Sequence, residues 1–327
     1  MDESFLDDAI PSVLSKTIFQ TFILMLVMRV AWSVVSFDRD TKIVSLKHLE
    51  SSRSLHGWSF IPHIYYGYRY RRNSFAYCLL STGCLHNETC NIWTHVFASL
   101  YFFNCFLSHD PSSTSKFVAL AACYLFTVSS VAHSCSCHSE YVEKVLFRVD
   151  RASIALYFLV FVLVAGYQHF VLSRGELIYF QIFGMFAVLA GITSASMMFF
   201  GDKYAKRTKV LILGSMLMSI LVPVLRERYY SSGPMKELKD KLVLLHLPTS
   251  LGFGLLGGIV FMTYFPERFY TKDTLRGKSP PKLGIFFQYF NSHSIMHVMV
   301  FASAWIGYSG QSKWDRVLQH EKNDSSS

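Results

Sequence analysis

The sequence predicts an all-α membrane protein whose core is a bundle of seven transmembrane helices. Hydrophobic residues make up 51% of the 327 residues and charged residues only 16%, a balance typical of a chain surrounded by lipid. Apolar runs of about 20 residues recur along the chain, which is the length that a helix needs to cross a bilayer core. Backbone groups in lipid must be hydrogen-bonded within the structure itself, so these runs are expected to be helices.

The predicted spans define a core at residues 76–310, between an N-terminal region at 1–75 and a polar tail at 311–327. A further apolar segment at 17–37 contains Arg29, whose charge is costly at the centre of a bilayer. We expect this segment to lie on the membrane as an interfacial helix, with an additional span as the alternative. The seven predicted spans cover residues 92–108, 116–134, 151–172, 178–200, 209–225, 242–265 and 289–308.

Lysine and arginine are unevenly divided between the two sets of loops. If the segment before the first span is cytosolic, the loops on that side carry 19 of these residues and the opposite side carries 10. The positive-inside rule then predicts a cytosolic N-terminal region and an extracellular C-terminus. The formal net charge of +9 is explained by loops facing anionic lipid and cytosol, so nucleic acid is not an expected partner.

This topology brings the polar ends of three predicted helices to the same, cytosolic, face. His293 and His297 begin the last predicted helix four residues apart, so their rings project from one face. His133 ends the second, with Ser129 one turn earlier, and Asp150 opens the third. Three neutral imidazoles are a common ligand set for catalytic zinc. The pattern predicts a Zn2+ site formed by the three histidines, with Ser129 and Asp150 beside the metal or its water. Interfacial histidines without a metal are the alternative.

Neighbouring polar residues have more than one interpretation. Cys135, Cys137 and His138 are rival ligands, although they run outward from the predicted helix into a loop. Glu88 is expected to pair with a basic neighbour and His95 to anchor the membrane interface, with a role near the site as the alternative for both. The seven cysteines show no extracellular framework, so we expect free thiols rather than disulfides.

Several of these stretches together resemble the progestin and adipoQ receptor family over residues 60–310. They are Ser129-x-x-x-His133, Asp150, His293-x-x-x-His297, NETCNIWTH at 87–95 and YFPERF at 264–269. That family is similar to alkaline ceramidases and haemolysin-III-like proteins, which share a site of Ser, Asp and three His. The resemblance implies a seven-helix fold with a cytosolic N-terminus. It also implies zinc held by the three histidines, and a water at the zinc that Asp150 and Ser129 hold or activate.

The stretch DRASIALYFL at 150–159 resembles the membrane progestin receptor branch more than the adiponectin receptor branch. Arg151 departs from the family, which usually has an aromatic residue there, and SCSC at 134–137 matches neither branch well.

Two functions fit these residues. The first is a multi-pass receptor, expected in the plasma membrane, that responds to a steroid or another lipid-related ligand and signals to a cytosolic partner. The alternative is a zinc-dependent, ceramidase-like hydrolase that takes a ceramide-like substrate from the surrounding membrane lipid, with Asp150 as the general base. The sequence leaves open whether the chain is an enzyme.

Overall fold

The computed structural model describes residues 61–64, 67–108, 113–172, 176–199, 245–269 and 282–326. Within these ranges the chain is helical and contains no strand. In chain order the elements are α5 (Phe75–Ser81), α6 (Thr89–Leu107), α7 (Ser115–Cys135), α8 (Glu140–Gly166), the π-helix η1 (Tyr167–Leu172), α9 (Leu177–Phe199), α12 (Leu247–Met262), the short 3-10 helix η4 (Glu267–Phe269), α14 (Lys282–Tyr289) and α15 (Ser292–Ser326).

The helices of the described part overlap six of the seven predicted spans, but α15 continues to Ser326, past the predicted end of the last span at residue 308. The run at 209–225 and the segment at 17–37 lie outside the described residues. By length and composition, three helical stretches can cross a membrane: Ser115–Cys135, Glu140–Leu172 and Leu247–Phe269. The all-α prediction is confirmed for the described residues, while the count of seven spans and the orientation of the termini stay predictions.

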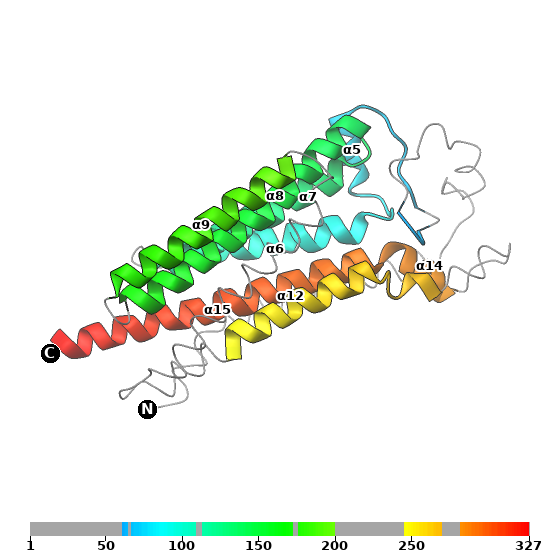
Figure 1. Cartoon of the computed structure of the whole chain (residues 1–327). Helices are drawn as coiled ribbons and strands as arrows, with labels where there is room; N and C mark the ends of the chain where they lie inside the picture. The colour runs from blue at the N-terminus through cyan, green and yellow to red at the C-terminus, as the bar shows by residue number, and fades with distance from the viewer. Residues whose placement is uncertain are drawn as a thin grey trace.

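The long helices lie roughly side by side in an elongated bundle (Figure 1). Successive helices from α6 to α9 pack against one another, and α15 packs along α12 and also contacts α6 and α7. The core between α6, α7 and α15 is aromatic: the rings of Phe102 and Phe126 stack 5.7 Å apart, and Phe301 meets both edge-on. The start of α15 lies at the same end of the bundle as α5 and α14, and the C-terminus lies at the opposite end (Figure 1).

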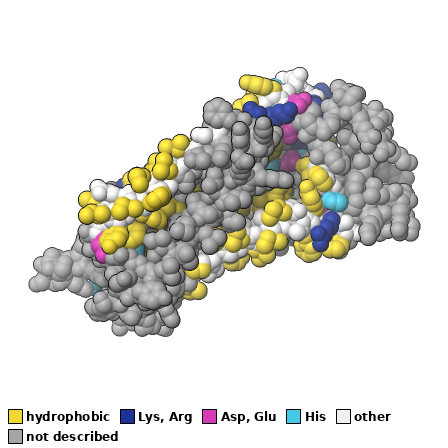
Figure 2. All heavy atoms as spheres, viewed as in Figure 1, with side chains coloured by type: hydrophobic (Ala, Val, Ile, Leu, Met, Phe, Trp, Pro, Cys, Tyr) yellow, Lys and Arg dark blue, Asp and Glu magenta, His cyan; other side chains and the backbone are white. Residues whose placement is uncertain are grey.

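Large apolar side chains cover much of the visible described surface along the bundle (Figure 2). Ile178 is 70% exposed, Phe186 64% and Met262 65%. In the stretch Leu247–Phe269, only 17% of the most apolar 18 residues are buried within the protein. Such a surface is unfavourable in water and is expected where helices face lipid.

Helix α8 begins eleven residues earlier than the predicted span. The Ser139 hydroxyl caps it by accepting a hydrogen bond from the backbone N–H of Val142 at 3.3 Å. Acidic residues in the first turn stabilise the helix by interacting with the positive end of its dipole. The prediction that Asp150 opens this helix is wrong, because the polar first turns were taken for a loop. Asp150 instead lies about three turns into α8.

A network of side-chain oxygens fixes the start of α15. The Asn291 amide oxygen accepts hydrogen bonds from the backbone N–H groups of His293 at 3.1 Å and Ser294 at 3.2 Å. The buried Glu267 carboxylate accepts from the backbone N–H of Ser292 at 2.8 Å and from its hydroxyl. These contacts satisfy N–H groups that have no partner within the helix, and they set the direction of the turns that carry the two histidines.

Candidate metal centre

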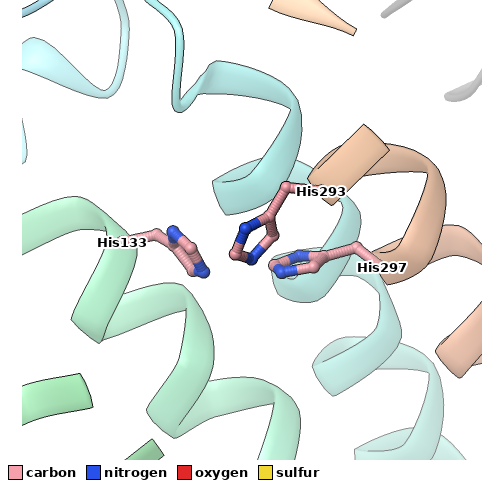
Figure 3. Close-up of side chains that lie close together, drawn as sticks. All are labelled: His133, His293 and His297. Atoms are coloured by element: carbon pink, nitrogen blue, oxygen red, sulfur yellow. The ribbon is translucent and has the colours of Figure 1, made fainter. Parts of the chain in front are cut away.

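The structure brings the side chains of the three predicted histidine ligands together (Figure 3). His133 lies in the last turn of α7, and His293 and His297 lie in the first two turns of α15. One ring nitrogen from each can be chosen so that all three lie within 4.8 Å of one another. The ring centroids are 4.7 to 5.0 Å apart. The chain therefore directs three imidazoles from two helices toward one point.

Glu88, directly before α6, determines how the His133 ring is turned. Its Oε2 atom lies 2.7 Å from His133 Nδ1 and accepts a second hydrogen bond at 2.7 Å from the Asn91 amide. Burial raises the pKa of Glu88, but the adjacent His133 imidazole outweighs this effect and holds the pKa below its usual range. A carboxylate can only accept, so His133 donates from Nδ1 and, as a neutral ring, keeps its lone pair on Nε2.

Asn91 orients the second histidine in the same way. His297 Nδ1 donates to the Asn91 backbone carbonyl at 3.2 Å, which leaves its Nε2 lone pair free in the neutral ring. The Asn91 side chain receives a hydrogen bond from the Ser294 hydroxyl at 2.6 Å. Asn91 thus connects Glu88, behind one candidate ligand, to the helix that carries the other two.

The donor set suits a metal ion. His133 Nε2 is buried and has no hydrogen-bond partner within the described part of the chain, an arrangement that is costly unless something else contacts the atom. A ligating histidine usually donates its other ring N–H to a carboxylate or carbonyl, as His133 and His297 do here. Among the described residues these three form the one group of His, Cys, Asp or Glu side chains with this spacing.

Ser129 and Asp150 lie beside this group rather than in it. Ser129 is buried one turn before His133 on α7. The half-buried Asp150 carboxyl on α8 is a hydrogen-bond neighbour of Ser129 and lies within the electrostatic influence of His133. The pair therefore faces the α7 side of the centre, even though α8 starts earlier than predicted.

The rival ligands lie elsewhere. Cys135 and Cys137 pack in a separate cluster with Cys78, and the His138 ring packs on Phe75 with centroids 4.2 Å apart. All seven cysteines are free.

His95 does not anchor a membrane interface, so that prediction is wrong. Its side chain is buried, and its ring stacks on His297 with centroids 3.6 Å apart and planes at 10°. Glu88, Asn91 and His95 share one face of the chain at i, i+3 and i+7. Three polar residues at this spacing, at and just before the start of α6, were the signal that could have placed all of them near the candidate metal centre.

Arg69 supports the end of α7 from outside the helix. Its guanidinium donates to the backbone carbonyls of His133 at 2.6 Å and Ser134 at 2.8 Å. It also donates to the hydroxyls of Ser81 at 2.9 Å and Ser136 at 3.0 Å. The last carbonyls of a helix have no partner within it, so this contact fixes the turn that presents His133.

A cavity of about 260 Å³ reaches the centre beside the end of α7 and the start of α15. It touches His133 and His293. Its wall combines charged, aromatic and apolar residues, including Arg69, Arg71, Glu88, Glu143, Phe147, Phe261 and Tyr264. Its size is slightly below the range of about 300–1,000 Å³ typical of small-molecule sites.

A family model described as haemolysin-III related matches residues 83–308, which include the three histidines, Glu88, Asn91, Ser129 and Asp150 but not Arg69. The chain belongs to the haemolysin-III related family. The chain is 25% identical over 292 residues to progestin and adipoQ receptor-like protein 1 of Caenorhabditis elegans, covering 85% of this chain and 62% of that protein. It is also 25% identical over 270 residues to the adiponectin receptor protein of Drosophila melanogaster, covering 76% of this chain and 55% of that protein.

Membrane progestin receptor alpha of Homo sapiens is 25% identical over 228 residues, covering 64% of each chain. This chain thus spans between about half and two thirds of the length of these relatives. The family match and the apolar helices together make this member of the haemolysin-III related family a membrane protein. Because the relatives carry the names of both receptor branches, the closer likeness to membrane progestin receptors stays a prediction.

Proposed function

We propose that this protein is a multi-pass membrane receptor of the progestin and adipoQ type that holds a zinc ion and responds to a steroid or another lipid-related ligand. The observation that carries the proposal is the convergence of three histidines from two helices within 4.8 Å, in a chain whose relatives are named as such receptors. A lipid ligand or its polar end enters through the cavity, and the basic loops transmit the response to a cytosolic partner.

His133, His293 and His297 are the proposed ligands of Zn2+. What supports them is the donor chemistry: three imidazoles, two of which donate their second ring nitrogen to Glu88 and to the Asn91 carbonyl. Zinc accepts three nitrogen ligands in a tetrahedral arrangement with the fourth position open. In a receptor, the ion's main effect is to join α7 to α15, because each helix supplies at least one ligand.

The proposed topology is the one expected from the loop charges. Seven spans cross the plasma membrane within the core at 76–310, with residues 1–75 in the cytosol and the tail at 311–327 outside. The metal centre and its cavity then open toward the cytosol. An epitope tag after residue 327 tests this topology: antibody should label it on intact cells, whereas labelling only after permeabilisation would reverse the orientation.

A second function, hydrolysis of a lipid amide, is favoured by the cavity, which reaches two of the three histidines. Zinc bound there would supply a Lewis acid that polarises a carbonyl and acidifies a water. Asp150 is the proposed general base, and Ser129 beside it holds the carboxylate in position. The substrate class is a ceramide-like lipid whose acyl chain stays in the membrane while its amide enters the cavity.

Metal content measured on the purified protein tests the proposed ligands. Wild type should retain one zinc per chain, and His297→Ala should lose it. His138→Ala is the matched control, because that ring lies near the end of α7 but packs on Phe75, and it should retain the ion. Equal zinc in wild type and in folded His297→Ala would refute the assignment.

Lipid assays on the same zinc-loaded preparations separate the two functions. A receptor should bind tritiated progesterone or a related steroid saturably, without releasing fatty acid from ceramide. A hydrolase should release fatty acid, and Asp150→Ala should abolish this while keeping its zinc. As a control for loss of charge on α8, the exposed Glu140→Gln should leave turnover unchanged. Absence of turnover in wild type would eliminate the hydrolase, and absence of steroid binding would eliminate the steroid as ligand.

A further inference from the structure

Three buried thiols gather beside the metal centre without contributing to it. Cys78 comes from α5, Cys135 ends α7 and Cys137 lies in the turn that follows, with exposures of 0%, 6% and 6%. The Sγ atoms of Cys78 and Cys137 are 3.5 Å apart. Among the described residues the three histidines have the spacing of metal ligands, and these thiols do not. Their arrangement therefore suits a bond between two sulfurs better than a metal site.

The two closest thiols differ in access. Cys137 lines the cavity that reaches His133, whereas Cys78 is not part of the cavity wall, so a small polar molecule in the cavity meets Cys137 first. Burial raises the pKa of Cys78 to about 12. Because the thiolate is the reactive form, Cys78 is a poor first nucleophile and Cys137 is the point at which an oxidant arrives.

We propose that Cys78 and Cys137 form a reversible oxidation site, in which a peroxide converts the two thiols into a disulfide. In the first step the Cys137 sulfur attacks one oxygen of hydrogen peroxide, the O–O bond breaks, and the products are a sulfenic acid and water. In the second step the Cys78 sulfur attacks the Cys137 sulfur, the S–O bond breaks, and a second water leaves. Two thiols are oxidised by two electrons and one peroxide is reduced to two waters.

The two sulfurs are already close. Reaching a disulfide length of about 2.05 Å from 3.5 Å requires them to approach by about 1.5 Å. Arg69 holds the same turn against α7 through the Ser136 hydroxyl at 3.0 Å. The disulfide would join segments 59 residues apart in the chain and tie α5 to the turn four residues after His133.

The test is peptide mapping of the full-length protein, purified in detergent. The protein is treated with hydrogen peroxide, its remaining thiols are blocked with N-ethylmaleimide, and non-reducing digests are analysed by mass spectrometry. We expect a cross-linked peptide pair joining Cys78 to Cys137 that disappears on reduction. Because this measurement uses wild type, it does not depend on whether any variant folds.

Variants identify the thiols. The cross-link should persist in Cys84→Ser, which removes an exposed thiol, and in Cys135→Ser, and it should be lost in Cys137→Ser. The proposal is overturned if peroxide oxidises Cys84 in wild type while Cys78 and Cys137 are both recovered as free thiols. It is also overturned if the recovered disulfide joins Cys78 to Cys135.

Discussion

Replacing Glu88 with glutamine measures how much the orientation of His133 contributes to metal binding. Glutamine has nearly the shape of glutamate but lacks its charge and one acceptor oxygen. The carboxylate accepts from His133 Nδ1 and from the Asn91 amide, both at 2.7 Å and both through Oε2. In Glu88→Gln, the amide nitrogen has two possible positions. It either takes the place of Oε2 and faces the two donors, or takes the place of Oε1, which lies 3.5 Å from the Asn87 amide nitrogen. One group in the network then loses its partner.

The expected loss follows from these contacts. Removing a partner behind a metal ligand typically lowers metal affinity by about 10- to 100-fold, or about 1.4–2.7 kcal/mol. Glu88 is almost fully buried and its hydrogen bond to His133 is charge-assisted, so we expect the upper part of this range. The ligands themselves are unchanged, so the variant should still bind one zinc, more weakly.

Competition with a chromophoric chelator of known zinc affinity, at fixed pH on detergent-purified protein, gives the ratio of the two affinities. Glu143→Gln is the matched control: Glu143 also lines the cavity, but no hydrogen bond joins it to His133. It should weaken zinc binding by clearly less than Glu88→Gln. Wild-type affinity in folded Glu88→Gln, or an equal loss in both variants, would show that the hydrogen bond to His133 is not what holds the ligand.

Three further results are expected. Asp315→Asn should lower the free energy of unfolding by about 2–3 kcal/mol, because an amide cannot accept from all the buried donors around it. The loss is measured as a lower Tm by differential scanning fluorimetry in detergent, and an unchanged Tm would contradict this. Arg69→Lys should also lower Tm, since one ammonium cannot span the acceptors that the guanidinium joins, whereas Arg72→Lys, at an exposed position, should not. Removing zinc with a chelator should lower the Tm of wild type but not of His297→Ala, because an ion bound only to the folded state stabilises it by mass action; equal shifts would place the metal elsewhere.

Helix positions were largely predictable because long apolar runs leave few alternatives in lipid. Helices α8 and α15 were the exceptions. The first turns of α8 are polar and charged and resemble a loop until the Ser139 cap is recognised, and α15 continues to Ser326, past the predicted end of the last span at residue 308. The histidine cluster was predictable in part, because the i, i+4 spacing places His293 and His297 on one face and the loop charges place His133 at the same depth.

The contacts that support the centre were harder to predict. Glu88 and His133 are 45 residues apart, and nothing local to either residue specifies the partner. We predicted a basic partner for Glu88, and His133 is that partner. The prediction did not connect Glu88 to the candidate metal centre. The stacking of His95 on His297 depends on how α6 packs against α15, which is a property of the assembled bundle.

Polar contacts link α7 to α15 at both ends, through Glu88 and Asn91 at the histidine end and directly through Asp315 at the other. The two ends differ in a way that a double variant can test. At the far end from the histidines, the buried Asp315 carboxylate accepts from the Ser113 hydroxyl at 2.6 Å, the Ser115 backbone N–H at 2.8 Å and the Gln168 amide at 2.8 Å. That end is satisfied by the chain's own groups, whereas His133 Nε2 is not satisfied within the described residues. The two ends lie about 27 Å apart along α7 at 1.5 Å per residue.

Changes this far apart with no shared partner usually add to within about 0.5 kcal/mol. The double variant Glu88→Gln with Asp315→Asn should therefore combine the two losses, with zinc affinity set by the first change and the Tm of the metal-free protein lowered chiefly by the second. A coupling clearly larger than this in the chelator competition would show that the contacts of Asp315 control the position of the histidines through the length of α7 and α15. The metal centre and the Asp315 network would then act as one unit rather than as two independent contacts between the same pair of helices.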